Sequence, residues 1–484
     1  MPLDPLYNPD GDQTTTLSHF TTQQNVQDHE TTYYFDQLID HFHPEKGTFK
    51  QRYWHSDEYY KSGGPVVLFT PGEQKADGFT SRLDKSTMSG AFAHALNGSG
   101  VVIEHRFFGE SNPYPDLSSE SLLVHTVEQA IEDMVYFARN VKLPQPGGDK
   151  LAPGNTAWIM VGCSYPGALT SFLVDRHPDV FWAGYAASAV VQSIANFWGY
   201  SDAIRQNTPA NCSADIAAAI NYVDSVLENN DTAEVHAVKA NFGLQEVVHV
   251  DDFVAALKSP LNYYQSNHTL YEQFCDALEV DDDGSVAPAS GFGQEHAFKA
   301  MGKYWKETYY PRCMSSLGTH NASSTRWNNT AAPNSGRSWK WLQCRNFGFF
   351  PVGAPEGYPS FVSRFLKLDH SERSCEYDFP GALHGTLRSP VLNALKVNSD
   401  HNGWNTTRPH LIFANGWRDP WRQATVAADG VQASHSDKQL RLIADGAHCS
   451  DSFITHSNKQ IEALQQTAIQ RMVDWFVEDF GWVH

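Results

Sequence analysis

The chain has 484 residues, of which 41% are hydrophobic and 19% are charged. This composition is typical of a folded globular protein with a large core, and it excludes extended disorder for most of the chain. The 35 basic and 55 acidic residues give a formal net charge of −20, which would repel nucleic acid and anionic membrane surfaces. In addition, no run of about 18 apolar residues, long enough to span a membrane, occurs. We therefore expect neither a nucleic-acid partner nor a membrane partner.

Two features of the chain indicate the secretory pathway. The seven cysteines include no C-x-x-C pair, so sparse disulfides are a better interpretation than a metal or redox motif. The N-terminus lacks the basic and apolar regions of a signal peptide, and we expect that such a signal was trimmed. Seven Asn-X-Ser/Thr sequons predict N-glycosylation, at Asn97, Asn211, Asn230, Asn267, Asn321, Asn328 and Asn405.

Residues 1–30 are predicted to form a flexible leader or a propeptide remnant. They include five acidic residues and no Lys or Arg, and they have too little apolar surface to order themselves. The folded body follows, where the aromatic segments 33–35 and 49–54 flank a turn at 43–47. This pattern predicts a hairpin of edge strands.

Four short, continuous apolar runs come next, and each is followed by a turn that contains glycine. They are residues 65–70, 100–104, 157–161 and 182–189. Continuous apolar strands that alternate with helices predict a parallel sheet covered on both faces. A capping box from Thr126 to Gln129 predicts the start of one helix, with an apolar face of Val127, Ala130, Ile131, Met134 and Val141.

The rhythm of strands stops after about residue 200 and returns with the runs 410–414 and 440–444, which an amphipathic helix follows. One sheet with an insertion explains this pattern better than three domains in series. We therefore predict an α/β fold in four segments: the leader 1–30, a first sheet segment 31–199, a helical insertion 200–385 and a second sheet segment 386–484.

The segment Gly162-Cys163-Ser164-Tyr165-Pro166-Gly167 directly follows the apolar run 157–161. A serine between small residues, where a strand changes into a helix, is typical of a nucleophile elbow, which exposes the hydroxyl on a strained turn. Pro166 stands where a glycine is usual, and it is tolerated because the first helical turn does not need its N–H.

Polar residues follow the two late strands in the order that such a fold requires. Asp419 follows the run 410–414, and His448 follows the run 440–444. Loops at the carboxyl ends of parallel strands meet at one edge of the sheet, so the order serine, acid, histidine predicts a triad of Ser164, Asp419 and His448. Alternatives for the acid are Asp429, Asp437 and Asp445.

This triad would hydrolyse an acyl bond. The serine attacks the carbonyl carbon, the histidine passes the proton to the leaving amine, and the aspartate holds the imidazole. The Tyr165 N–H is predicted to bind the oxyanion together with Gly72 or Glu73, from the loop after the run 65–70. The Glu73 side chain has two further interpretations, the cap of a turn or a site for a substrate ammonium group. No metal and no cofactor are expected.

Cys163 and Cys449 flank two of the predicted catalytic residues. They should be neighbours if the triad assembles, either as thiols or as a disulfide. Glu104, His105 and Arg106 are predicted to form a buried network under the site.

The chain resembles the proline-specific serine peptidases, which include lysosomal Pro-X carboxypeptidase, dipeptidyl peptidase 2 and the fungal prolyl endopeptidases. The resemblance covers about 33–484 and is closest to the secreted fungal enzymes. It is carried by FDQLIDHF at 35–42, FKQRYW at 49–54, TPGE at 70–73, EHRFFGES at 104–111, GCSYPG at 162–167, DPW at 419–421 and GAHC at 446–449.

The resemblance implies an α/β-hydrolase core with a helical cap, and hydrolysis on the carboxyl side of proline. It implies that Trp421 lines the proline pocket, where a flat indole suits a pyrrolidine ring, and that Ala168 occupies a pocket position. Core packing is the alternative for Trp421. The implied disulfides are Cys212–Cys275 and Cys344–Cys375, with Cys313 left unpaired.

The cleavage mode stays open between prolyl endopeptidase, Pro-X carboxypeptidase and dipeptidyl peptidase, and an esterase is a more distant alternative. Related serine carboxypeptidases carry Glu at the position of Cys163 to bind a C-terminal carboxylate, a device this chain lacks. The resemblance and the net charge imply activity at acid pH. We expect a secreted monomer or homodimer that acts on proline-containing peptides or proteins, with a lysosomal or vacuolar location as the alternative.

Overall fold

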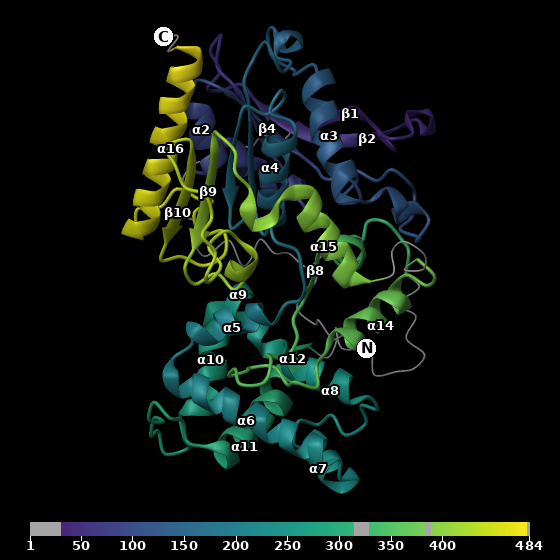
Figure 1. The fold of residues 1–484 in the computed structure, drawn as a ribbon, viewed down its shortest axis with the longest axis vertical. Helices are drawn as coiled ribbons and strands as arrows, with labels where there is room; N and C mark the ends of the chain where they lie inside the picture. The colour runs from purple at the N-terminus through teal and green to yellow at the C-terminus, as the bar shows by residue number, and fades with distance from the viewer. Residues whose placement is uncertain (1–30, 314–328, 383–388, 482–484) are drawn as a thin grey trace. The chain divides into compact units, whose positions relative to one another are not determined.

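The computed structural model describes residues 31–313, 329–382 and 389–481, drawn as a ribbon in Figure 1. The predicted leader 1–30 lies outside the described residues, as do the sequons at Asn321 and Asn328 and the side chain of Cys313. Predictions for these residues stay predictions.

An eight-stranded sheet forms the centre of the fold, in the order β1-β2-β4-β3-β5-β6-β9-β10. Strand β2 pairs antiparallel with β1 and with β4, and all pairs from β4 to β10 are parallel. Every predicted apolar run forms one of these strands. Their bounds are β1 Tyr33–Leu38, β2 Thr48–Ser56, β3 Val66–Phe69, β4 Ser99–Ile103, β5 Trp158–Cys163, β6 Ala183–Ala187, β9 Leu411–Gly416 and β10 Gln439–Ala444.

Strands β1 and β2 form the predicted hairpin. Of these two strands only β1 lies at an edge of the sheet, because β2 also pairs with β4. The helices that accompany the sheet are α2 Met88–Ala95, α3 Val127–Asn140, α4 Tyr165–Arg176, α13 Ser335–Leu342, α15 Pro390–His401 and α16 Lys459–Phe480.

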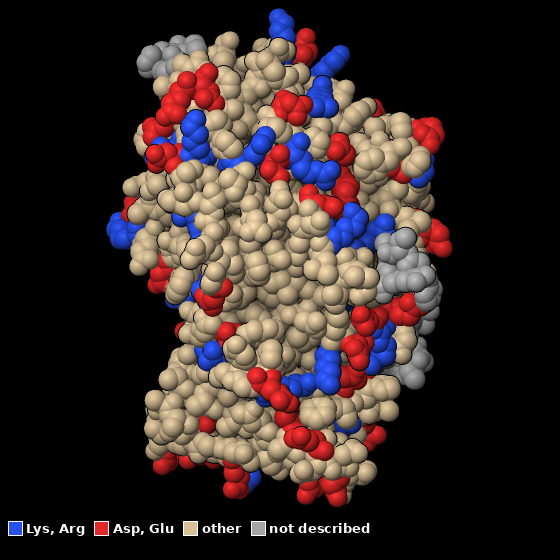
Figure 2. Space-filling model, viewed as in Figure 1, with Lys and Arg blue, Asp and Glu red and all other residues tan. Residues whose placement is uncertain are grey.

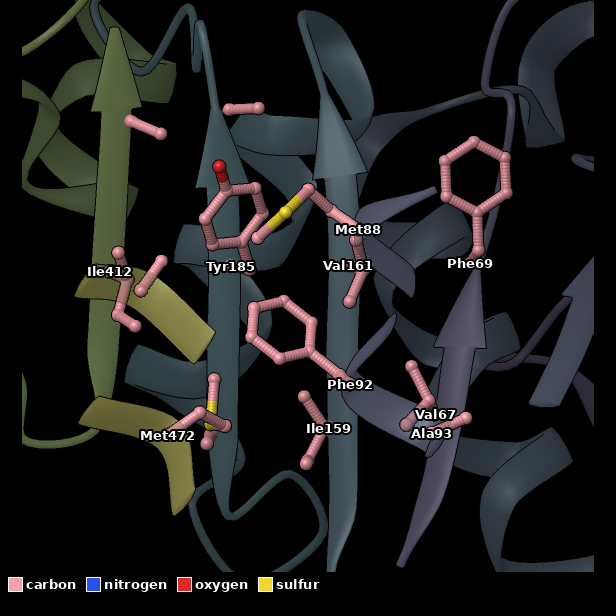
Figure 3. Packing of buried hydrophobic residues seen from close by; sticks show 14 of the residues in the cluster. Val67, Phe69, Met88, Phe92, Ala93, Ile159, Val161, Tyr185, Ile412 and Met472 are labelled. Carbon is pink, nitrogen blue, oxygen red and sulfur yellow. The ribbon is translucent and has the colours of Figure 1, made fainter. Parts of the chain in front are cut away.

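Helices cover both faces of the sheet because consecutive strand residues point to opposite faces. On one face, Ile159 of β5 lies in a buried cluster with Phe92 of α2 and Met472 of α16 (Figure 3). On the other face, Trp158 meets Phe137 of α3 edge to face, with ring centroids 6.3 Å apart. A mainly parallel sheet between two helical layers confirms the predicted α/β-hydrolase architecture.

Helix α3 begins where the sequence predicts, at Thr126, whose side chain accepts a hydrogen bond from the Gln129 N–H at 3.2 Å. A capping box also requires the Gln129 side chain to bond back to the Thr126 N–H, and this part of the prediction is wrong. Gln129 Nε2 donates to Asp40 Oδ1 at 2.6 Å, and Gln129 Oε1 accepts from the His41 N–H at 3.0 Å. The amide therefore ties the chain after β1 to α3, a contact that local sequence does not contain.

The described residues fall into two compact units. The sheet unit comprises the described parts of Pro9–Ser193, Thr330–Phe347 and Leu392–His484, and the insertion unit comprises those of Ile194–Asn329 and Gly348–Val391. The chain leaves the sheet after β6 and returns at β9, the neighbour of β6. The prediction assigned 200–385 to one insertion, whereas Thr330–Phe347 lies with the sheet unit.

The insertion unit is mainly helical. Its disulfide Cys212–Cys275 joins α6 to α10, with the two Cα atoms 5.3 Å apart. Its elements are β7 Ile194–Asn196, α5 Trp198–Gln206, α6 Ala210–Asn229, α7 Thr232–Asn241, α8 Val250–Leu257, α9 Tyr263–Ser266, α10 His268–Glu279, α11 Gln294–Tyr304, α12 Tyr310–Cys313, β8 Gly348–Phe350 and α14 Leu368–Asp378.

Cys344 and Cys375 are also disulfide-bonded, and their pairing with each other stays a prediction. Three of the sequon asparagines, Asn230, Asn267 and Asn405, are exposed.

Among the described helices, none combines the length and the apolar character that crossing a bilayer requires. Figure 2 shows acidic and basic side chains interspersed on the face that it draws. The negative net charge is therefore not gathered there into one patch of a single sign.

Candidate active site

The turn between β5 and α4 holds the predicted nucleophile. Strand β5 ends at Cys163 and α4 begins at Tyr165, with Ser164 between them. Ser164 has φ 65° and ψ −126°, a backbone conformation that residues with a Cβ atom rarely adopt. Its N–H donates to the Ala187 carbonyl of β6 at 2.9 Å. The segment thus has the backbone geometry of a nucleophile elbow.

Two glycines make this turn possible because the chain passes close to other backbone atoms. A Cβ atom on Gly162 would overlap the carbonyl oxygen of Pro166, and one on Gly167 would lie 2.6 Å from the Ala187 oxygen. Pro166 lies in the first turn of α4, as predicted. The small residues around the serine are therefore required by space as well as by dihedral angles.

The loop after β3 lies against the elbow. Gly72 has φ +67°, and a Cβ atom there would overlap the Pro166 ring and lie 3.3 Å from the Tyr165 ring. Close approach of this loop to the start of α4 is what two backbone donors for one oxyanion require. The Gly72 N–H itself donates to Thr70 Oγ1 at 3.3 Å. Which of the two residues, Gly72 or Glu73, supplies the second N–H for the oxyanion stays a prediction.

The Glu73 side chain is an unusual group at this position. Its Oε2 atom is buried and has no hydrogen-bond partner among the described residues. Burial raises the pKa of this carboxyl to about 7, although its own backbone N–H and the nearby His448 act in the opposite direction. Glu73 is therefore neutral in acid and becomes charged near neutral pH.

Asp419 and His448 meet at the carboxyl ends of β9 and β10. His448 Nδ1 lies 2.8 Å from Asp419 Oδ1 and 2.9 Å from Oδ2. The Asp419 side chain is 1% exposed and that of His448 is 10% exposed, so little water competes for this bond. Asp419 Oδ1 also accepts the Trp421 N–H at 2.8 Å. An imidazole held at Nδ1 has Nε2 available for proton transfer.

Two of the alternative acids have other partners. Asp445 Oδ1 lies 2.8 Å from Arg418 Nε, and Asp429 Oδ1 lies 2.8 Å from Arg422 Nη1. These ion pairs favour Asp419 as the acid that orients the histidine.

A disulfide joins the elbow to the histidine loop. Cys163 and Cys449, 286 residues apart in sequence, are bonded, with their Cα atoms 5.9 Å apart. Of the two states that the sequence leaves open, the structure has the bridged one. Ser164 and His448 are thus each one residue from the same covalent link. The Cys449 N–H also donates to Ser188 Oγ, just after β6, at 3.1 Å.

A buried polar network lies under the site, as predicted for residues 104–106. Glu104 accepts from Arg52 Nε at 2.8 Å and from Arg52 Nη2 at 2.6 Å. His105 Nε2 lies 2.9 Å from the Tyr165 hydroxyl, and burial lowers the pKa of His105 to about 4. Arg106 pairs with a buried carboxylate of α3. Satisfied groups of this kind fix the residue that follows the serine.

The predicted pocket residues differ in their surroundings. The Trp421 ring lies beside the ring of His448, the predicted catalytic base, with ring centroids 6.1 Å apart. Ala168 is fully buried in the first turns of α4. Their roles toward substrate stay predictions.

The sequence gives no signal for two features of this site. The contact of Cys449 with Ser188 and the burial of the Glu73 carboxyl both depend on segments that are distant in sequence. The flanking positions of Cys163 and Cys449 were the only clue to the disulfide.

Comparison with known families gives a match over most of the chain. The family described as serine carboxypeptidase S28 matches residues 37–468. The chain belongs to this family. It is therefore a serine peptidase of the S28 family, as its elbow and its buried histidine and aspartate pair lead one to expect.

Its relatives include three fungal proteins. Serine protease vicPb of Bipolaris victoriae is 31% identical, with 92% of this chain and 88% of that protein aligned. Serine protease vicPa of the same fungus is 32% identical over the same shares. A probable extracellular serine carboxypeptidase of Arthroderma benhamiae is 28% identical, with 88% of this chain and 63% of that protein aligned.

Proposed function

We propose that this S28 peptidase hydrolyses peptide bonds on the carboxyl side of proline, through an acyl-enzyme formed on Ser164. The observation that carries the proposal is the buried pair of Asp419 and His448, linked to the elbow by the Cys163–Cys449 disulfide. A hydroxyl on a strained turn, beside an imidazole that a carboxylate orients, is the arrangement that acyl transfer needs.

The reaction begins at the serine hydroxyl. Ser164 Oγ attacks the carbonyl carbon of the proline residue, and His448 Nε2 takes the hydroxyl proton and delivers it to the leaving amine. Asp419 holds the ring at Nδ1 and stabilises the imidazolium. Water then attacks the acyl-enzyme with the same histidine as base, and the serine is regenerated.

Charge that develops on the carbonyl oxygen would be stabilised by backbone donors. The Tyr165 N–H at the first position of α4 is one donor, and the helix dipole adds to its effect. The second donor comes from Gly72 or Glu73. Below pH 7 the Glu73 carboxyl is neutral, so it adds no negative charge beside the oxyanion. This supports the proposal that the enzyme works in acid.

Proline specificity rests on the family resemblance and on Trp421. An indole next to the catalytic histidine gives a flat apolar surface for a pyrrolidine ring, whose fixed φ presents one shape. The side chain before the nucleophile is a half-cystine, which offers no charge to a substrate carboxylate. This favours the endopeptidase mode over the carboxypeptidase mode.

We further propose that the enzyme is secreted and N-glycosylated. One relative is named as extracellular, and disulfides persist in oxidising compartments. Exposed sequons at Asn230, Asn267 and Asn405 are accessible to glycosylation.

Product analysis by mass spectrometry tests the reaction. The substrates are a peptide with one internal proline, either free or blocked at each end, and a matched peptide with alanine in place of proline. We expect cleavage after proline in the doubly blocked peptide, no cleavage of the alanine peptide, and no product with Ser164→Ala.

The other outcomes distinguish the alternatives. A requirement for a free C-terminus would indicate carboxypeptidase action, and a requirement for a free N-terminus would indicate dipeptidyl peptidase action. Equal cleavage of the proline and alanine peptides, or hydrolysis of short esters alone, contradicts the proposed specificity.

A further inference from the structure

Two sulfur atoms and an imidazole gather at the catalytic site. The Sγ atoms of Cys163 and Cys449 and a ring nitrogen of His448 all lie within 4.8 Å of one another, and all three residues are partly buried. Within the described ranges of the chain, this is the one group of three His, Cys, Asp or Glu ligand atoms gathered so closely. As a disulfide, the two sulfurs cannot act as thiolate ligands.

We infer that reduction of the Cys163–Cys449 disulfide opens a site for a soft divalent cation, Zn²⁺ in particular, held by both cysteine sulfurs and His448. The cation would bind the imidazole nitrogen that the proposed reaction uses as its base. The disulfide would then keep the enzyme active and also exclude the metal.

The set of ligands suits zinc. Two thiolates and one imidazole supply three of four tetrahedral positions, and water or a substrate atom fills the fourth. With Zn–S bonds of about 2.3 Å, two thiolates on one zinc ion lie about 3.8 Å apart. Loss of the covalent bond lets the sulfurs move from bonding distance to roughly this separation, through side-chain rotation alone.

The histidine is already oriented as metal-binding histidines are. Such a residue usually gives its second ring nitrogen to a carboxylate, which fixes the ring and increases its basicity as a ligand. Asp419 holds His448 Nδ1 at 2.8 Å and 2.9 Å, so Nε2 is the nitrogen available to the metal.

The backbone keeps both cysteines in place without the disulfide. Cys163 is the last residue of β5, and the next N–H, that of Ser164, donates to the Ala187 carbonyl at 2.9 Å. The Cys449 N–H donates to Ser188 Oγ at 3.1 Å. Cys163 also lies next to the N-terminus of α4, where the helix dipole favours a thiolate.

The chemical steps balance with a dithiol as reductant. The dithiol gives two electrons and two protons, the Sγ–Sγ bond breaks, two thiols form, and the dithiol closes to its own disulfide. Zn²⁺ then binds both sulfurs and Nε2, and the two thiol protons pass to solvent.

Cobalt titration tests the site without reference to activity. The full-length protein is reduced, freed of reductant under argon, and titrated with Co²⁺. We expect one equivalent to bind, with thiolate-to-cobalt absorption and tetrahedral visible bands, and expect the oxidised protein to show neither. Stoichiometric Zn²⁺ should remove the bands and lower the activity of the reduced enzyme by at least about tenfold, with recovery on chelation.

Two variants make the test specific. Reduced Cys163→Ala keeps one sulfur and the imidazole and should bind Co²⁺ at least about tenfold more weakly. Reduced Cys212→Ala/Cys275→Ala lacks a different bonded pair, in the insertion unit, and should give the same bands as the wild type. Circular dichroism verifies that each reduced protein is folded.

The inference is overturned if folded, reduced wild type gives no thiolate-to-cobalt band, or if Cys163→Ala gives an equal one. Unfolding of the sheet unit on reduction would overturn it as well, because the site needs both loops in place. Failure to cleave proline peptides would refute the proposed function and leave the cobalt result intact, so the two failures are distinguishable.

Discussion

Asp419 is the residue whose proposed role is best supported by its contacts. Its two oxygens lie within 2.9 Å of His448 Nδ1, and a buried carboxylate at this position both orients the ring and stabilises its cationic form. Asp445, also in the histidine loop, pairs with Arg418 on the surface instead. These two aspartates are therefore a matched pair for mutation.

Asp419→Asn should lower kcat/KM for the best substrate by roughly 10⁴-fold, because the amide favours the wrong imidazole tautomer. Asp445→Asn should leave the activity within about twofold of wild type, since an exposed ion pair contributes little. Steady-state kinetics at one pH measure both. Equal losses in the two variants would remove Asp419 from the mechanism.

The titration of Glu73 makes the free energy of unfolding depend on pH. A carboxyl whose pKa rises from 4.5 unfolded to about 7 folded binds its proton more tightly in the folded state. The stability from this group is fully present below about pH 4.5, and it is lost as pH rises to about 7. The loss is on the order of 3 kcal/mol for a shift of this size.

Glu73→Gln should therefore gain in Tm relative to wild type as pH rises from 4 to 8, because the amide carries no charge to bury. Thermal unfolding of both proteins at the two pH values measures the gain. A Tm difference that is the same at pH 4 and pH 8 would show that Glu73 does not titrate in this range.

At the scale of elements, the site exists because parallel strands end together and helices seal both faces of the sheet. Phe92 of α2 is fully buried and packs against the Tyr185 ring of β6, with the ring centroids 5.3 Å apart. Each strand of the central sheet carries apolar residues at the period that its structure requires, which is why these strands could be predicted, whereas the short strands β7 and β8 were not. The side-chain partners could not, since Gln129 bonds to Asp40 instead of closing its own capping box.

Phe92→Ala should lower the free energy of unfolding by about 3–5 kcal/mol, the usual cost of a cavity in a core. Phe42→Ala removes the same atoms from a side chain that is 63% exposed, and should cost less than about 0.5 kcal/mol. Urea denaturation of both variants gives the comparison. A cost for Phe92→Ala as small as that for Phe42→Ala would contradict the burial of Phe92 in the core.

At the scale of the whole molecule, the chain interrupts one sheet to build a second unit. Strands β6 and β9 are neighbours, although more than two hundred residues separate them in sequence. The insertion unit has its own disulfide, Cys212–Cys275, which closes a loop of 63 residues. Such a link stabilises mainly by restricting the unfolded chain.

Replacement of both cysteines, Cys212→Ala/Cys275→Ala, should lower the stability of the insertion unit by about 2–4 kcal/mol. Native-state hydrogen exchange that resolves α6 and α10 measures this effect, with strands β5 and β6 of the sheet unit as internal reference. Unchanged protection in α6 and α10 of the double variant would contradict the expectation.

The sequence by itself determined the strands of the central sheet, the elbow and the order of serine, acid and histidine, because apolar periodicity, small residues and turn chemistry are local properties. Only the tertiary structure decided that Cys163 bonds to Cys449, that the Glu73 carboxyl is buried and that Asp419 reaches His448 while Asp445 turns to Arg418. Each of these depends on distances between segments far apart in the chain, which the packing of the sheet and its helices sets.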